Sequence, residues 1–136
     1  MEVEKGPVVR LIARHPSYSA DSISQMLNMS PSNASSVGEH RMTPKGSQLK
    51  GVYKETVWSR SLSIEGGDVS NSIEELISTL QKRKLDISKI ISTGGNILIT
   101  IDLPGNLNIG EELSVSQLFY LSSLQISFGF EVFPQM

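Results

Sequence analysis

Apolar residues recur at helical spacing in the centre of the chain. They are Ile73, Leu76, Ile77 and Leu80. Positions i, i+3, i+4 and i+7 lie on one side of a helix, so the spacing predicts an amphipathic helix with one buried stripe. The segment before it, residues 56–64, alternates as a strand does, and its apolar side carries Trp58, Leu62 and Ile64. We therefore expect Trp58 to be buried against the helix stripe, where the two elements would form the nucleus of the core.

The same reasoning predicts the other elements. The apolar run at residues 8–13 is typical of a central strand that is covered on both faces. Residues 97–101 and 126–133 are interpreted as strands, and residues 85–91 as a short apolar turn. The expected inner face of the last helix is Val115, Leu118, Leu121 and Leu124. Three pairs predict capping boxes at the starts of three helices: Ser22 with Gln25, Ser72 with Glu75, and Ser114 with Gln117.

Residues 29–51 differ from the rest of the chain. They lack apolar periodicity and contain Pro and Gly among Ser, Asn and Lys, which predicts a long flexible loop at about 29–51. The expected order is then strand, helix, loop, strand, helix, strand, helix, strand. About four strands in a mainly antiparallel sheet, with about three helices packed on it, make a single α+β sandwich domain over residues 1–136.

Charge and cysteine content narrow the functional classes. The chain has no Cys, and its net charge of -2 lacks the strong positive sign typical of a direct nucleic-acid binder. We expect a cytoplasmic protein, and no apolar run is long enough to predict a membrane span. The charge is unevenly distributed, because after Thr93 the chain has acids but no Lys or Arg. These acids are Asp102, Glu111, Glu112 and Glu131.

The sequence contains no pattern that indicates catalysis or metal binding. The two histidines, His15 and His40, are far apart in the sequence, and no Cys is present to complete a zinc site. His15, beside Pro16 at the end of a strand, is interpreted as a solvated turn residue. No nucleophile-elbow or phosphate-binding glycine motif occurs. We therefore expect neither enzymatic activity nor a cofactor or metal.

Several features, taken in their order along the chain, resemble one protein family. Trp58 follows a basic stretch that contains Gly, and a Ser-Ile-Glu-Glu-Leu-Ile helix comes next. A late helix with Leu121-Ser122-Ser123-Leu124 then precedes an aromatic strand with the sequence Phe128-Gly129-Phe130. Together, over about residues 8–132, these features resemble the bacterial domain-of-unknown-function family 4279. That resemblance implies no known reaction, but some small members of the family resemble immunity proteins of toxin systems, including contact-dependent inhibition.

Two functions follow as hypotheses. The first is a non-catalytic inhibitor that binds a cognate toxin domain. If the toxin is a nuclease, its surface would be cationic, and the contact would include the acids after Thr93. The second is a regulatory module that binds a small ligand or a peptide of negative charge through a basic stretch. Its candidate residues are His40, Arg41, Lys45 and Lys50.

Overall fold

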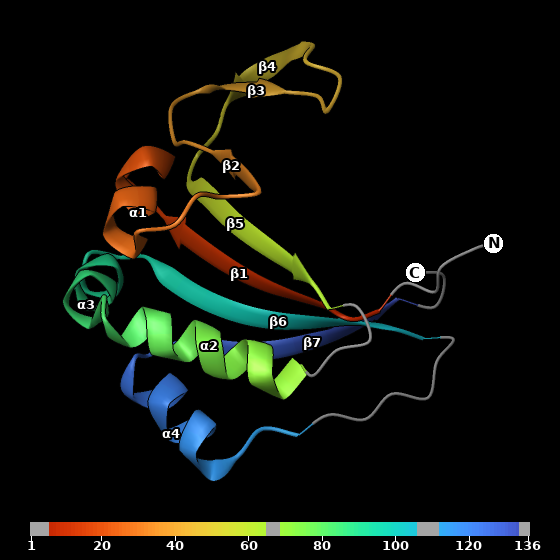
Figure 1. The fold of residues 1–136 in the computed structure, drawn as a ribbon. Coiled ribbons are helices and arrows are strands. Elements are labelled where there is room, and N and C mark those ends of the chain that lie inside the picture. The colour runs from red at the N-terminus through yellow and green to blue at the C-terminus, as the bar shows by residue number, and fades with distance from the viewer. Residues whose placement is uncertain (1–5, 65–68, 106–111, 134–136) are drawn as a thin grey trace.

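The computed structural model describes residues 6–64, 69–105 and 112–133. The chain folds as one α+β domain, in which a curved sheet is covered by helices on one side (Figure 1). The strands are β1 (Val8–His15), β2 (Asn33–Ser35), β3 (His40–Met42), β4 (Gln48–Val52), β5 (Thr56–Ser63), β6 (Asn96–Pro104) and β7 (Ser127–Phe133). The helices are α1 (Ala20–Leu27), α2 (Val69–Gln81), α3 (Lys84–Ser92) and α4 (Val115–Ser123).

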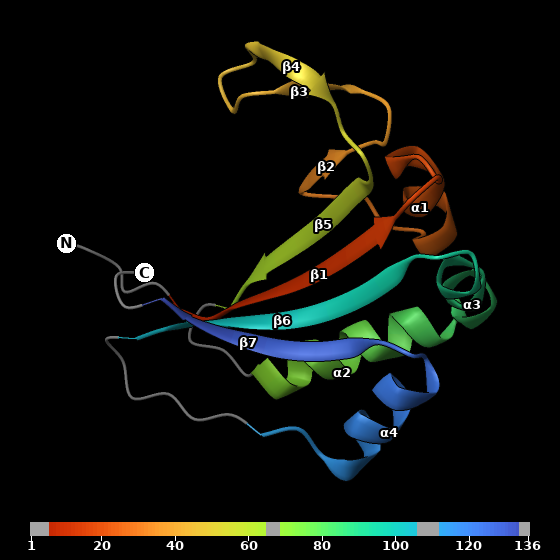
Figure 2. The same ribbon diagram turned by 180° about the vertical axis from the view of Figure 1, so that it is seen from behind.

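Five strands form the main sheet in the order β2-β5-β1-β6-β7. All neighbours are antiparallel except β6 and β7, which run parallel. The prediction that the first strand is central is confirmed, because β1 pairs with β5 on one side and β6 on the other. Its expected cover on both faces is wrong, since the residues of β1 alternate between partly exposed and buried. The helices lie on one face only, and Figure 2 shows the helix-free face.

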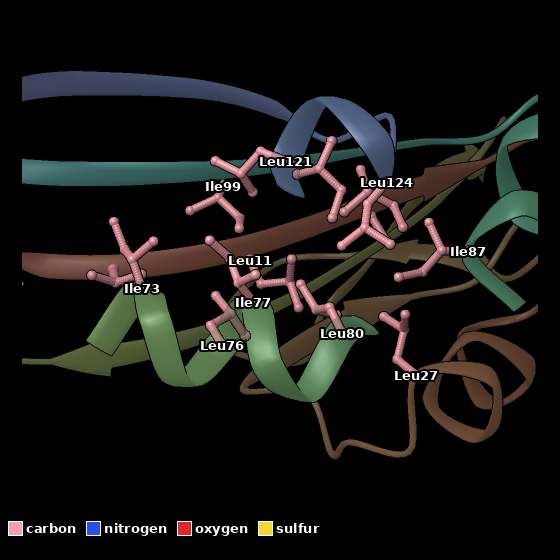
Figure 3. Packing of buried hydrophobic residues seen from close by; sticks show 14 of the residues in the cluster. Leu11, Leu27, Ile73, Leu76, Ile77, Leu80, Ile87, Ile99, Leu121 and Leu124 are labelled. Atoms are coloured by element: carbon pink, nitrogen blue, oxygen red, sulfur yellow. The ribbon is translucent and has the colours of Figure 1, made fainter. Parts of the chain in front are cut away.

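The helix α2 confirms the predicted stripe. Its four aliphatic positions are buried and meet the side chains of β1 and β6, such as Leu11 and Ile99 (Figure 3). Each buried aliphatic side chain of this kind contributes about 1.5–3 kcal/mol through the loss of apolar surface from water. Cross-strand neighbours build the floor below, where Ala13 is paired with Trp58 on one side and Ile97 on the other. The core is therefore a single layer between the sheet and the helices.

Trp58 is completely buried, as the alternation of β5 predicts. Its indole nitrogen donates a hydrogen bond of 2.9 Å to the hydroxyl of Ser24 on α1. The hydrogen bond shows that the ring reaches α1, a contact that the sequence pattern did not predict. A buried indole N–H usually finds such a partner, because leaving it without one is costly.

Two of the three predicted capping boxes are misplaced. The first helix starts earlier than expected, since Ser19 is the N-cap of α1 and accepts from the backbone N–H of Ser22. Ser72 lies inside α2, which already begins at Val69. The third box is confirmed, because Ser114 and Gln117 satisfy each other's backbone N–H groups at the start of α4.

The structure also has more elements than the sequence predicted. The five-stranded sheet, the separate β3–β4 hairpin and four helices in the described residues replace the expected four strands and three helices. The apolar turn at residues 85–91 is in fact the helix α3, in which only Ile87 and Ile90 are buried. The stretch 29–51 is not an irregular loop, because it contains β2, β3 and β4. These strands are short and mostly exposed, so their side chains carry no apolar alternation.

Candidate functional site

The helix α4 faces the core with an unexpected side. Gln117 is buried, and its amide nitrogen donates to the carbonyl of Ser70 at 3.1 Å and to the carboxylate of Glu74 at 2.9 Å, both on α2. Leu121 and Leu124 are buried as predicted. A helix advances about 100° per residue, so turning Gln117 inward turns the stripe of residues 115, 118 and 119 outward. The prediction that Val115 and Leu118 belong to the inner face is therefore wrong.

The outward side of α4 is strongly apolar. Val115 is 84% exposed, Leu118 51% and Phe119 64%. Their spacing of i, i+3 and i+4 places the three side chains on one stripe. Exposed apolar side chains that stand alone are ordinary on proteins, but a contiguous stripe is typical of a contact surface. We call Val115, Leu118 and Phe119 the α4 stripe.

A groove adjoins the α4 stripe on the side of α3. It has a volume of about 640 Å³, and Phe119 and Tyr120 of α4 line it together with Leu85 of α3. Leu85 is 81% exposed, although it stands at the start of a helix that buries Ile87 and Ile90. Lys84 is the one charged residue that lines the groove, and within the described residues it has no ion pair. The groove thus combines apolar and polar side chains with one free cation.

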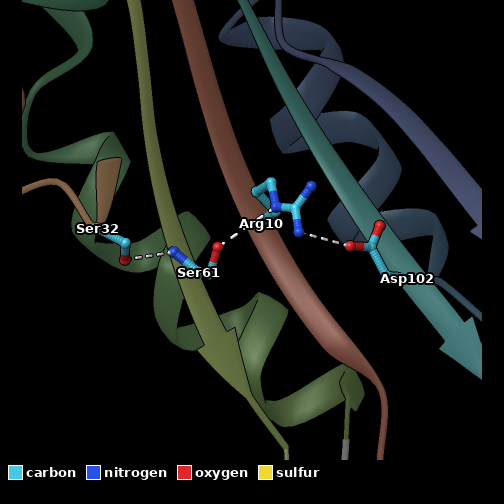
Figure 4. Close-up of polar contacts among 4 residues, drawn as sticks. All are labelled: Arg10, Ser32, Ser61 and Asp102. Atoms are coloured by element: carbon cyan, nitrogen blue, oxygen red, sulfur yellow. Dashed lines mark hydrogen bonds and ion pairs between the residues drawn. The ribbon is translucent and has the colours of Figure 1, made fainter. Parts of the chain in front are cut away.

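The structure places three of the four acids predicted to bind a partner, and one of these three is buried. Glu112 and Glu131 are exposed, the first just before α4 and the second on β7, whereas Glu111 lies outside the described residues. Asp102 is only 3% exposed and therefore has no surface to offer a partner. It forms an ion pair of 3.0 Å with Arg10, whose side chain crosses the helix-free face of the sheet (Figure 4).

Arg10 organises a polar cluster on that helix-free face. Besides its ion pair, the guanidinium donates from Nε to the hydroxyl of Ser61 at 3.3 Å. Two buried oxygens beneath it, Oγ1 of Thr100 and Oδ1 of Asp102, have no hydrogen-bond partner within the described residues. Both oxygens have almost no accessible surface, whereas the side chain of Arg10 is 38% exposed, so the cluster is a half-buried polar contact between β1, β5 and β6.

The residues of the alternative ligand site lie on one hairpin. His40 and Arg41 are on β3, Lys50 is on β4, and Lys45 is in the turn between them. All four are exposed. The ring of His40 is within 3.3 Å of the side-chain nitrogen of Gln48 across the hairpin. The structure therefore brings these four residues together, in a hairpin where the sequence predicted a loop.

His15 corrects a further prediction, because it is completely buried rather than solvated. Its Nδ1 accepts from the backbone N–H groups of Ser17 at 3.0 Å and Tyr18 at 2.9 Å. The proton of the neutral ring is then on Nε2, which donates to the hydroxyl of Thr93 at 2.7 Å. Burial lowers the pKa of His15, and its ring stacks on Tyr18 at 3.8 Å between centroids. These contacts give His15 a structural role where β1 joins α1.

The described residues contain no group of three or more His, Cys, Asp or Glu side chains arranged to hold a metal ion. No helix among them is long and apolar enough to cross a membrane. The fold and these surfaces define an α+β domain with the apolar α4 stripe at one end and the basic β3–β4 hairpin at the other.

A comparison with protein families identifies the chain more closely. The family described as "Domain of unknown function (DUF4279)" matches residues 7–132, so the chain belongs to this family. The resemblance predicted from the sequence is thereby confirmed. Comparisons with curated proteins and with solved structures found no match.

Proposed function

We propose that this protein performs no chemistry and acts by binding another protein, as an immunity protein does when it blocks its cognate toxin domain. The observation that carries the proposal is the α4 stripe, in which three large apolar side chains are exposed on a helix that buries a glutamine. The immunity role itself rests on the resemblance of small family members to such proteins, and it places the binding event in the bacterial cytoplasm.

The partner should offer a segment with a large apolar side chain next to a carboxylate. The apolar side chain fits between Phe119 and Leu85, and the carboxylate fits the free cation of Lys84, which also lines the groove. Aromatic residues in such positions are frequent hot spots, where truncation costs 2 kcal/mol or more, about 30-fold in affinity. The α4 stripe would lie in an apolar groove of the partner, as amphipathic helices do in many complexes.

The exposed acids Glu112 and Glu131 have a smaller part in this proposal. If the toxin domain is cationic, they accelerate association by electrostatic attraction, and the on-rate falls as salt rises. Their effect on the dissociation rate is small, because exposed charges at the rim of an interface are screened by water and ions.

The experiment is a binding measurement with the protein domain encoded by the neighbouring gene, since an immunity gene should lie directly beside its toxin gene. Phe119→Ser should weaken binding at least about 30-fold. The matched control is Phe130→Ser on β7, because Phe130 is 69% exposed and Phe119 64%, but Phe130 lies outside the α4 stripe. Equal affinities for the two variants would remove the α4 stripe from the proposal. If the wild-type protein neither binds nor protects against any neighbouring gene product, the immunity role fails.

A further inference from the structure

The β3–β4 hairpin is an ordered arm outside the main sheet. It stands at the opposite end of the molecule from α4, as both views of the ribbon show (Figures 1 and 2). Every residue of its two strands is exposed. Hydrogen bonds fix its base, where Gly38 donates to the carbonyl of Tyr53 and Tyr53 donates to that of Glu39, both at 2.9 Å.

Hydrogen bonds also fix the tip of the β3–β4 hairpin. The backbone N–H of Thr43 donates to the carbonyl of Ser47 at 2.8 Å, and that of Ser47 donates to the hydroxyl of Thr43 at 3.0 Å. Gly46 has a φ of +88° in this turn, a conformation that favours glycine. A segment with no apolar core is thus shaped by backbone hydrogen bonds, which leaves its side chains available to a partner.

The positive charge of the hairpin is uncompensated. Residues 40–52 include Arg41, Lys45 and Lys50 but no Asp or Glu. Among the described residues none of these three cations has an ion pair. The nearest acids in the sequence are Glu39, which accepts from the backbone N–H of Ser36, and Glu55, which is paired with Arg14 at 3.8 Å.

The hairpin also exposes three apolar side chains. Met42 is 45% exposed, Leu49 40% and Val52 46%. A surface that binds nucleic acid neutralises many phosphates and is usually rich in Lys and Arg across a whole face. Here three cations alternate with three apolar residues on a chain of net charge -2. Mixed apolar and cationic side chains, with Met and Arg among them, are typical of protein–protein interfaces.

We propose that the β3–β4 hairpin is a second docking surface, whose partner is an acidic patch on a protein. It is separate from the α4 stripe, so the two surfaces can bind at the same time. The cations are exposed, so they suit the surface of another protein better than a small ligand. A small ligand is usually bound in a concave site that encloses it on several sides.

The test uses poly-L-glutamate as the acidic probe and a short DNA duplex as the competing anion, both measured by fluorescence anisotropy at low salt. The variant is Arg41→Gln/Lys50→Gln. The control, Lys82→Gln/Lys89→Gln, removes the same charge from exposed positions near α3. We expect the hairpin variant to lose affinity for poly-L-glutamate about tenfold, and the control to retain it. Both variants should keep the wild-type melting temperature, because all four side chains are exposed.

Three outcomes would overturn the proposal. Equal losses in the two variants would show that only net charge matters. Absence of binding by the wild-type protein would exclude an acidic partner for the hairpin. Tighter binding to DNA than to poly-L-glutamate, lost in the hairpin variant, would make the hairpin a nucleic-acid arm. Phe119→Ser should leave binding of both probes unchanged, so failure here is distinguishable from failure of the α4 stripe.

Discussion

The hydrogen bond from Trp58 to Ser24 is the contact on which the packing of α1 against β5 can be tested most directly. Trp58→Ala should lower the free energy of unfolding by about 3–5 kcal/mol, because it empties a completely buried aromatic position. Ser24→Ala keeps the ring but removes the acceptor, which leaves the buried indole N–H without a partner and should cost about 1–3 kcal/mol.

A double-mutant cycle separates the hydrogen bond from the packing. Trp58→Phe removes the N–H and part of the ring, and Ser24 is only partly buried, so its hydroxyl can then bond to water. In the Trp58→Phe background, Ser24→Ala should therefore cost much less than it does alone. The expected coupling between the two positions is about 1 kcal/mol or more.

The assay is urea unfolding followed by circular dichroism, which reports on variants with and without Trp58 alike. In the wild-type protein, the single Trp also gives a fluorescence signal, whose emission should be that of a buried indole before unfolding and of a hydrated one afterwards. Strict additivity of Ser24→Ala and Trp58→Phe would refute the hydrogen bond. A native emission spectrum like that of free tryptophan in water would refute the burial of the ring.

Three further predictions concern stability. Burial lowers the pKa of His15, so as the pH falls below about 6.5 the histidine is protonated in the unfolded chain before it is protonated in the folded one. The stability that neutral His15 contributes is full above that pH and should fall below it by up to about 1.4 kcal/mol per pH unit. Urea unfolding measures this slope, which His15→Asn should remove. Gly95→Ala should cost about 1–3 kcal/mol in the same assay, since its methyl group would meet a backbone oxygen at 2.7 Å, whereas Gly129→Ala, with no contact under 3.9 Å, should change stability by less than about 0.5 kcal/mol. Arg10→Met should cost about 1–3 kcal/mol, because it leaves the buried carboxylate of Asp102 unpaired. Arg14→Met should cost about 0–1 kcal/mol, because its partner Glu55 is 3.8 Å away and exposed. Equal losses in the two variants would contradict the difference between the two ion pairs.

The parts of the fold that the sequence predicted are those in which side chains alone determine the structure. The stripe of α2 and the burial of Trp58 follow from apolar spacing, and the central place of β1 follows from its apolar run. The strands β2, β3 and β4 were not predicted, because backbone hydrogen bonds hold them and their side chains are exposed. The helix α3 buries only Ile87 and Ile90, too few positions to show a helical period.

The candidate site could be predicted only in part for a related reason. The hairpin cations stand out in the sequence, and only their arrangement on two paired strands required the structure. The α4 stripe was assigned to the wrong side of its helix, because the pattern of apolar residues cannot show that Gln117 has partners on α2. Those partners, Ser70 and Glu74, precede Gln117 by more than forty residues. Their hydrogen bonds with its amide form only when the chain has folded, so no local sequence pattern can show them. A Gln at the third position of a capping box was the one local signal.

The orientation of α4 links the fold to the proposed function. A rotation of the helix by about 100° would bury Leu118 and expose Gln117, but Leu124, which lies seven residues after Gln117 on the same side of the helix, would turn outward as well. The capping box and the hydrogen bonds of Gln117 to α2 oppose that rotation, since burying the apolar side chain at their expense would leave Glu74 and the carbonyl of Ser70 without their donor. The polar contacts of Gln117, together with the burial of Leu121 and Leu124, thus keep Val115, Leu118 and Phe119 on the exposed side of α4.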